Sequence, residues 1–239
     1  MKKYYYLTLS SALLLPSISH ADEANASLKF SGNVGFFSEY VFRGISQSDE
    51  SPALQGGFDV EHESGLHAGI WGSSVDFNDG DEAHLETDIY GGYAANINQF
   101  HYDIGGIYYA YPGADSNLNY DFFEIYGAVG YDFKKFSLSG SVNFSPDYFA
   151  ESGNAVYTAA TIEAPIYEAL SASAQIGYQS IEDNAAFGVP DYTDWSLGLN
   201  YNYNDFDFSL KYTDTNLNEP TECADGCDAR IIFGISKSF

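Results

Sequence analysis

Hydrophobic and polar side chains alternate along residues 28–42 at the start of the chain. The even positions carry Leu28, Phe30, Gly32, Val34, Phe36, Ser38, Tyr40 and Phe42, and the odd positions are mostly polar. Because successive side chains of a strand point to opposite faces, this period of two predicts a β-strand with one apolar face. The run exceeds the roughly 5–6 residues usual in soluble sheets and exceeds the roughly 9–11 that a tilted membrane-spanning strand needs.

The same alternation recurs along the rest of the chain and predicts eleven further strands. They are expected at residues 54–62, 66–77, 85–95, 100–111, 120–131, 136–145, 155–164, 170–179, 193–203, 206–212 and 229–239. Long polar connections and short turns follow one another in strict alternation, as in bacterial outer-membrane barrels. We therefore predict an all-β fold, a transmembrane antiparallel up-and-down β-barrel of about twelve strands with both termini in the periplasm. A slip of phase within 66–77 predicts either a bulge or a strand end buried on both faces.

Composition narrows the class of protein. The formal net charge is −25, with 34 acidic and 9 basic residues among 239. Such a charge repels phosphates and argues against a nucleic-acid partner. The 21 Tyr and 18 Phe argue against disorder. Aromatic residues gather beside two predicted short turns, which fits an interfacial girdle, although strand propensity alone also enriches Tyr and Phe.

The two ends of the chain carry export and assembly features. Residues 1–21 have a basic start, an apolar run and a small-x-small end at Ala21, which predicts a secretory signal peptide cleaved after Ala21. A membrane anchor is the weaker alternative, because the apolar run is short and Pro16 interrupts it. Residues 22–27 then form a short periplasmic segment and residues 28–239 the barrel, in the bacterial outer membrane. The terminal Phe239 resembles the signal by which barrel-assembly machinery recognises its substrates.

Three stretches carry a family resemblance. They are SEYVFRGISQS at 38–48, SGLHAGIWGSSVDF at 64–77, and the run that places Glu86, Asp88, Tyr90 and Gly92-Tyr93. With these stretches the chain resembles the TorF-type putative porins of proteobacteria, most closely in its N-terminal half. The resemblance implies an outer-membrane barrel and a porin role, without a substrate.

The polar faces of the strands are expected to line the lumen, where carboxylates outnumber cations. Rings of carboxylates favour cations in a pore. We therefore predict a narrow, cation-preferring channel for passive diffusion of small solutes or ions, among outer-membrane lipid and lipopolysaccharide. Alternatively, the carboxylates pair internally and the lumen is closed. The predicted pore-lining residues are Lys29, Glu39, Arg43, Asp59, Glu61, Glu86, Asp88, Asp103, Glu124, Lys211 and Arg230.

Arg43 follows Glu39 on the same predicted strand face, at the mouth of a loop. Its guanidinium could hold an anionic ligand group or a constriction carboxylate, although a structural partner to nearby acids is the more common role.

The remaining motifs carry little chemistry. Cys223 and Cys227 flank the turn pair Asp225-Gly226, which predicts a small disulfide and no metal site. The acidic loops do not match an EF-hand. No G-x-S-x-G elbow is present, so no catalytic residue and no cofactor is predicted. An outer-membrane barrel enzyme and a surface interaction protein remain as alternatives to the channel.

Overall fold

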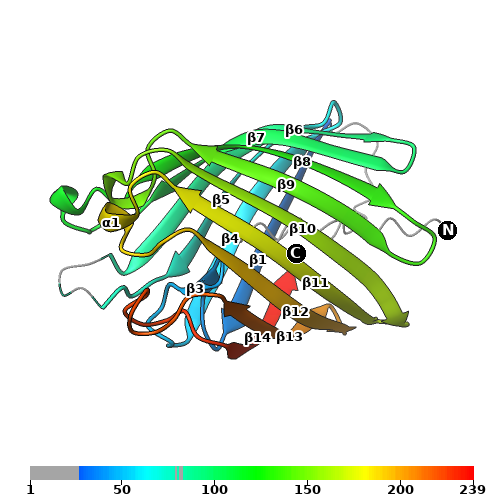
Figure 1. Cartoon of the computed structure of the whole chain (residues 1–239). Coiled ribbons are helices and arrows are strands. Elements are labelled where there is room, and N and C mark those ends of the chain that lie inside the picture. Colours follow the sequence, from blue (N-terminus) through cyan, green and yellow to red (C-terminus); the bar gives the residue numbers. More distant parts are fainter. Residues whose placement is uncertain (1–26, 79, 81–82) are drawn as a thin grey trace.

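The computed structural model describes residues 27–78, 80 and 83–239. The predicted signal peptide and most of the segment 22–27 lie outside these residues. Twelve strands close into one antiparallel barrel, which confirms the predicted fold class (Figure 1). The barrel strands are β1 (Leu28–Phe37), β4 (Ala53–His62), β5 (Leu66–Ser74), β6 (Leu85–Ile97), β7 (Phe100–Ala110), β8 (Phe122–Asp132), β9 (Ser137–Ser145), β10 (Ala155–Tyr167), β11 (Leu170–Ile181), β12 (Tyr192–Tyr203), β13 (Phe206–Thr215) and β14 (Arg230–Ser238).

Each strand pairs with its neighbours in the chain, and β1 pairs with both β4 and β14 to close the ring. At this seam the backbones of Gly32 and Phe239 exchange two hydrogen bonds of 2.9 Å. The Phe239 ring also lies where a side chain at position 32 would stand, 2.9 Å from an added Cβ, and it meets Phe58 edge-on. The terminal Phe is therefore part of the barrel wall, and its place explains a glycine on the outer face of β1.

The outward positions are apolar and the inward positions polar, the reverse of a soluble protein. In β9, Leu138 and Val142 are exposed, whereas Ser139 and Asn143 are buried. The most exposed of the large apolar side chains is Phe30, at 76% of its surface. A band of this kind around a closed barrel matches the lipid-facing surface of outer-membrane proteins.

Connections alternate between the two ends of the barrel, because consecutive antiparallel strands reverse direction. The long connections, residues 38–52, 75–84, 111–121, 146–154, 182–191 and 216–229, form what we call the loop end. The short turns and the start of β1 form the turn end. The loop end carries the short helices η1 (Ser116–Leu118), η2 (Phe149–Glu151) and α1 (Asn184–Phe187). No helix among the described residues has the length and apolar content to span a membrane.

Several strand boundaries differ from the sequence prediction, among them those of β1, β5 and β10. β1 ends at Phe37 rather than residue 42, and the chain then forms a separate hairpin from β2 (Val41–Phe42) and β3 (Ile45–Ser46). β10 extends to Tyr167, three residues beyond its predicted end at residue 164, with a register shift between Pro165 and Tyr167. β5 pairs on both sides without a register shift, so the slip of phase there is no bulge: Trp71 faces the lumen.

Candidate functional site

Residues 38–52 leave the barrel wall and fold into the lumen at the loop end; we call them the inserted loop. Its hairpin turns at Arg43 and Gly44, whose φ angles are 47° and 84°. Positive φ at both turn positions is the geometry of a type I′ hairpin, and glycine fits the second position. An added Cβ at Gly44 would stand 2.5 Å from Thr215 Cγ2 and 2.8 Å from Asp194 Cβ. The tip of the inserted loop is therefore pressed against β12 and β13.

Arg43 extends from this tip to the opposite wall. β9 stands six strands from β1 in either direction around the ring, and the two partners of Arg43 lie on β8 and β11, on either side of it. Arg43 Nη2 is 2.7 Å from Glu124 Oε2, and Nη1 donates to Gln179 Oε1 at 2.9 Å. The guanidinium carbon lies 4.3 Å from the centroid of the Tyr157 ring. One buried arginine thus joins the inserted loop to three strands of the far wall.

The surroundings of Arg43 and Tyr40 determine their protonation states. Burial alone lowers the pKa of Arg43, but the charge of Glu124 and the nearby tyrosines raise it, and the net pKa lies well above its ordinary value. Burial, followed by the charge of Glu86, raises the pKa of Tyr40. Arg43 therefore stays protonated and Tyr40 neutral across the physiological pH range.

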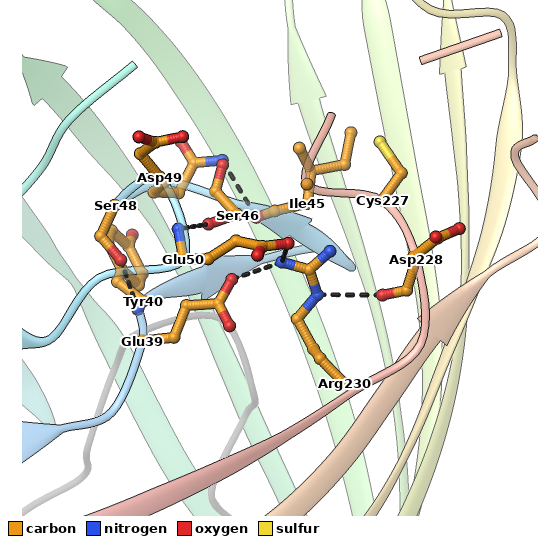
Figure 2. A network of polar contacts seen from close by, with 12 residues as sticks. Glu39, Tyr40, Ile45, Ser46, Ser48, Asp49, Glu50, Cys227, Asp228 and Arg230 are labelled. Carbon is orange, nitrogen blue, oxygen red and sulfur yellow. Dashed lines mark hydrogen bonds and ion pairs between the residues drawn. The ribbon is translucent and has the colours of Figure 1, made fainter. Parts of the chain in front are cut away.

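Two further contacts hold the inserted loop. Tyr40 donates to Glu86 Oε1 at 2.7 Å and meets the ring of Trp71 edge-on at 5.5 Å. At the rim, Arg230 forms ion pairs with Glu39 and Glu50, and its Nε donates to a backbone carbonyl of the last long loop (Figure 2). The loop is thus attached both inside the lumen and at its rim.

The last long loop, residues 216–229, packs against the second strand of the hairpin. Cys223 and Cys227 form a disulfide within it. The Ser46 amide donates to the Gly226 carbonyl at 2.9 Å, and Ile45 packs on the buried cluster that contains both cysteines. The disulfide-bearing loop is therefore a support for the inserted loop.

Solvent access to the lumen changes from one end to the other. Inward positions of β12 pass from buried at Asp194 and Ser196 to exposed at Asn200 and Asn202 towards the turn end. β6 shows the same gradient, from Glu86 and Asp88 to its exposed last residues. Aromatic side chains of the long loops pack with Tyr40 and Trp71 into one buried cluster. The lumen is therefore accessible from the turn end and filled at the loop end.

The structure places eight of the eleven predicted pore-lining residues in four groups. Glu86, Asp88 and Glu124 are buried inside the barrel beneath the inserted loop. Lys211 faces the lumen on β13, where buried Thr213 is the next inward position. Lys29 and Glu61 are register partners at the turn end. Asp59 and Asp103 lie on the wall formed by β4 to β8. Asp59 accepts a hydrogen bond from Tyr90. Asp103 bonds to His67 at 3.0 Å and accepts from Tyr126 at 3.3 Å.

The expected position of Glu39 and Arg43 on the first strand is wrong. Both follow the end of β1, since the chain turns inward after Phe37. Glu39 pairs with Arg230 at the rim, and Arg43 lies in the lumen. The sequence favoured an unspecified acidic residue as a structural partner of Arg43. In the structure Glu124 takes this place, 81 residues further along the chain.

Sequence reasoning did not select several residues that make these contacts. Gln179 and Asp194 stand at inward positions of their strands and are almost fully buried, so strand parity could have identified them. Tyr157 on β10 donates to Asp194 on β12, across the strand β11 that lies between them. Aromatic residues at inward positions could have indicated a packed lumen. They were not used in this way, because Tyr and Phe were expected at the lipid boundary.

Solved structures share this architecture at low sequence identity. A KdgM porin, in complex with disordered oligogalacturonate, matches with a TM-score of 0.60 at 9% identity, covering 87% of this chain and 99% of that one. The NanC porin matches with a TM-score of 0.58 at 13% identity, covering 88% and 99%. The COG4313 outer membrane channel from Pseudomonas putida F1 matches with a TM-score of 0.52 at 11% identity, covering 93% and 100%. These likenesses show the fold.

Sequence comparison identifies the family directly. A search of curated proteins finds no match. A family model described as "Bacterial protein of unknown function (Gcw_chp)" matches residues 21–239. Because the match spans nearly the whole chain, this protein belongs to the Gcw_chp family.

Proposed function

We propose that the protein is an outer-membrane channel for small solutes or ions. The observation that carries the proposal is a closed barrel with an apolar exterior and a polar interior. Closure satisfies every strand edge, which a bilayer demands, and only an exterior of this kind is stable in lipid. The similarity in fold to KdgM, NanC and the COG4313 channel supports the same function.

The lumen favours cations over anions. Carboxylates project inward from β4, β6, β7, β8 and β12, whereas the inward cations of the described strands are few. Arg43, which enters the lumen from the inserted loop, is already neutralised by Glu124. A passage lined in this way attracts cations and repels anions. An acidic oligosaccharide such as the oligogalacturonate in the KdgM structure is therefore not the expected solute here.

The orientation follows from the usual arrangement of bacterial barrels. We propose that residues 1–21 direct export, that the turn end and both termini face the periplasm, and that the loop end faces outward among lipopolysaccharide. Phe239 is proposed as the residue read by the barrel-assembly machinery. The narrower likeness to TorF-type putative porins fits the same role.

The inserted loop is proposed to form the constriction. It joins opposite walls through Arg43, so solute flow depends on how far the loop moves from this position. The contacts that fill the loop end also favour a second candidate, a barrel closed at that end that acts through its acidic loops. Within residues 27–78, 80 and 83–239, no constellation comparable to these contacts supports an outer-membrane barrel enzyme.

Conductance measurements test the proposal. The refolded native chain in a planar bilayer should show discrete conductance steps, and a salt gradient should give a reversal potential of the sign for cation preference. Neutralising lumen carboxylates one at a time should shift that potential gradually, whereas an enzyme would lose activity in one step. An anion-selective reversal potential would contradict the selectivity. Silence of both the native chain and a variant lacking residues 40–47 would contradict the channel itself.

A further inference from the structure

Among the buried polar atoms of the described residues that have no hydrogen-bond partner, two stand side by side and face the lumen. Asp88 on β6 is 3% exposed, and its Oδ1 has no partner; Trp71 on β5 is 3% exposed, and its indole Nε1 has no partner. The two residues are register partners on adjacent strands. Side chains at directly opposed positions lie within reach of one small molecule. The site therefore offers one acceptor and one donor, close together and unsatisfied.

The neighbours of Asp88 leave its charge uncompensated. Glu124 is neutralised by Arg43 and accepts further hydrogen bonds from Tyr109 and Asn143. Glu86 receives a hydroxyl hydrogen bond from Tyr40. Asp88 has neither kind of partner. A buried carboxyl group in such surroundings is neutral until a cation approaches and stabilises its charged form.

A metal ion fits this site poorly. Among the residues that the structure describes, the only three metal-binding side chains with ligand atoms close together are Glu219, Cys223 and Cys227. Those two sulfurs already form the disulfide. The carboxylates around Asp88 do not converge in that way, whereas an ammonium group needs only one carboxylate and gains from aromatic faces nearby.

We propose that Asp88 and Trp71 form a binding site for a small hydroxylated amine, such as an amino sugar or an amino alcohol. The ammonium group donates to Asp88, and an adjacent hydroxyl accepts from the indole N–H of Trp71. The rings of Trp71, Tyr40 and Tyr109 enclose the cation. The inference rests on the proposed channel for the route of the solute and names its chemical class.

Access to the site comes from the turn end. Beyond Asp88, the inward positions of β6 are Tyr90 and Gly92, which are half-buried, and then Ala94 and Asn96, which are exposed. The inserted loop covers the other side through Tyr40. Asp88 is therefore the innermost carboxylate that a solute meets on this wall.

Titration calorimetry on the refolded native chain in detergent tests the site. Glucosamine should bind saturably, and N-acetylglucosamine, which has the same ring but no ammonium group, should not bind at matched ionic strength. Asp88→Asn should weaken glucosamine binding about tenfold or more, since a charge-assisted contact is lost. Asp207→Asn is the matched control, because Asp207 faces the lumen at the turn end and bonds only locally to Asn202.

A second variant separates the two halves of the site. Trp71→Phe should lower the affinity for glucosamine severalfold and leave that for cyclohexylamine, which has no hydroxyl, unchanged. Equal isotherms for glucosamine and N-acetylglucosamine would overturn the proposal and leave ordered water as the partner of both atoms. An unaffected Asp88→Asn variant would also overturn it. The comparison of ligands uses the native chain, so it decides the matter even if a variant fails to fold.

Because binding is measured in detergent, its outcome is independent of conduction. A chain that conducts and does not bind glucosamine refutes the site alone. A chain that binds glucosamine and never conducts refutes the channel alone.

Discussion

Replacing Arg43 with methionine should release the inserted loop. Methionine keeps much of the apolar length of the side chain but removes the ion pair to Glu124 at 2.7 Å and the hydrogen bond to Gln179 at 2.9 Å. Glu124 is 1% exposed, so it would remain buried without its counter-ion. Removing one partner of a buried ion pair typically costs about 3–5 kcal/mol. Because Arg43 attaches the inserted loop and not a barrel strand, we expect this cost to fall on the docking of the loop.

That free energy corresponds to a large change in local opening. At about 1.4 kcal/mol for each tenfold change, docking should weaken by roughly two to four powers of ten. The Gln47 amide donates to the Tyr40 carbonyl, and the Tyr40 amide donates to Ser48 Oγ. Exchange of these two amides should accelerate accordingly, while exchange in β9 stays unchanged. In planar bilayers the same variant should show larger or more frequent conductance steps than the native chain.

Two further variants define the control and the refutation. Arg43→Met with Glu124→Gln should recover part of the lost protection, because the unpaired charge is then removed as well. Arg230→Met removes both rim ion pairs. Its effect should be smaller than that of Arg43→Met, since the Glu50 side chain is 57% exposed and the Glu39 side chain 9%, against 1% for Glu124. Unchanged amide protection in Arg43→Met, together with native conductance, would refute the view that this arginine holds the loop in the lumen.

Three other substitutions test the remaining supports. Gly44→Ala introduces a methyl group where the turn is in contact with the wall and has positive φ, so it should loosen the inserted loop and raise conductance; a native exchange pattern would contradict this. Replacing Cys223 and Cys227 with serine should lower the free energy of unfolding in urea by about 2 kcal/mol, as expected for so short a closed segment, and an unchanged midpoint would contradict it. Ile176→Arg on the lipid face should destabilise the barrel by about 2–4 kcal/mol, whereas Gln175→Arg on the lumen face should be tolerated; equal effects would contradict the assigned faces.

The barrel itself could be predicted from the sequence because its rule is local. Strand parity needs only neighbouring residues: Phe136 to Phe144 alternate with serine and asparagine, and β9 forms there. Alternation of long and short connections fixes which strand ends meet. The strand number and the antiparallel order follow from these two regularities, and both are observed.

The inserted loop could not be predicted from the same rule. The alternation continues unbroken past Phe37 through Tyr40 and Phe42, so parity extends the strand by five residues. Aromatic residues suit both a lipid-facing strand and a packed lumen, and the pattern alone does not separate the two. The pair Arg43-Gly44 is also not the Asn-Gly or Asp-Gly pair that usually predicts a tight hairpin. The contacts that decide the outcome lie on strands far along the chain.

The sequence could predict which carboxylates point into the lumen. It could not predict which side chains they bond to. Glu124 and Asp88 both occupy inward positions of neighbouring parts of the wall, yet only Glu124 receives the arginine. That difference arises because the hairpin turn aims Arg43 towards β8 and β11 and leaves β6 to Tyr40, a neutral donor that reaches Glu86. The charge that remains for a solute is therefore set by a loop rather than by the barrel wall. If the proposed channel function holds, a family member with the same strands and a different inserted loop should select different solutes for the same reason.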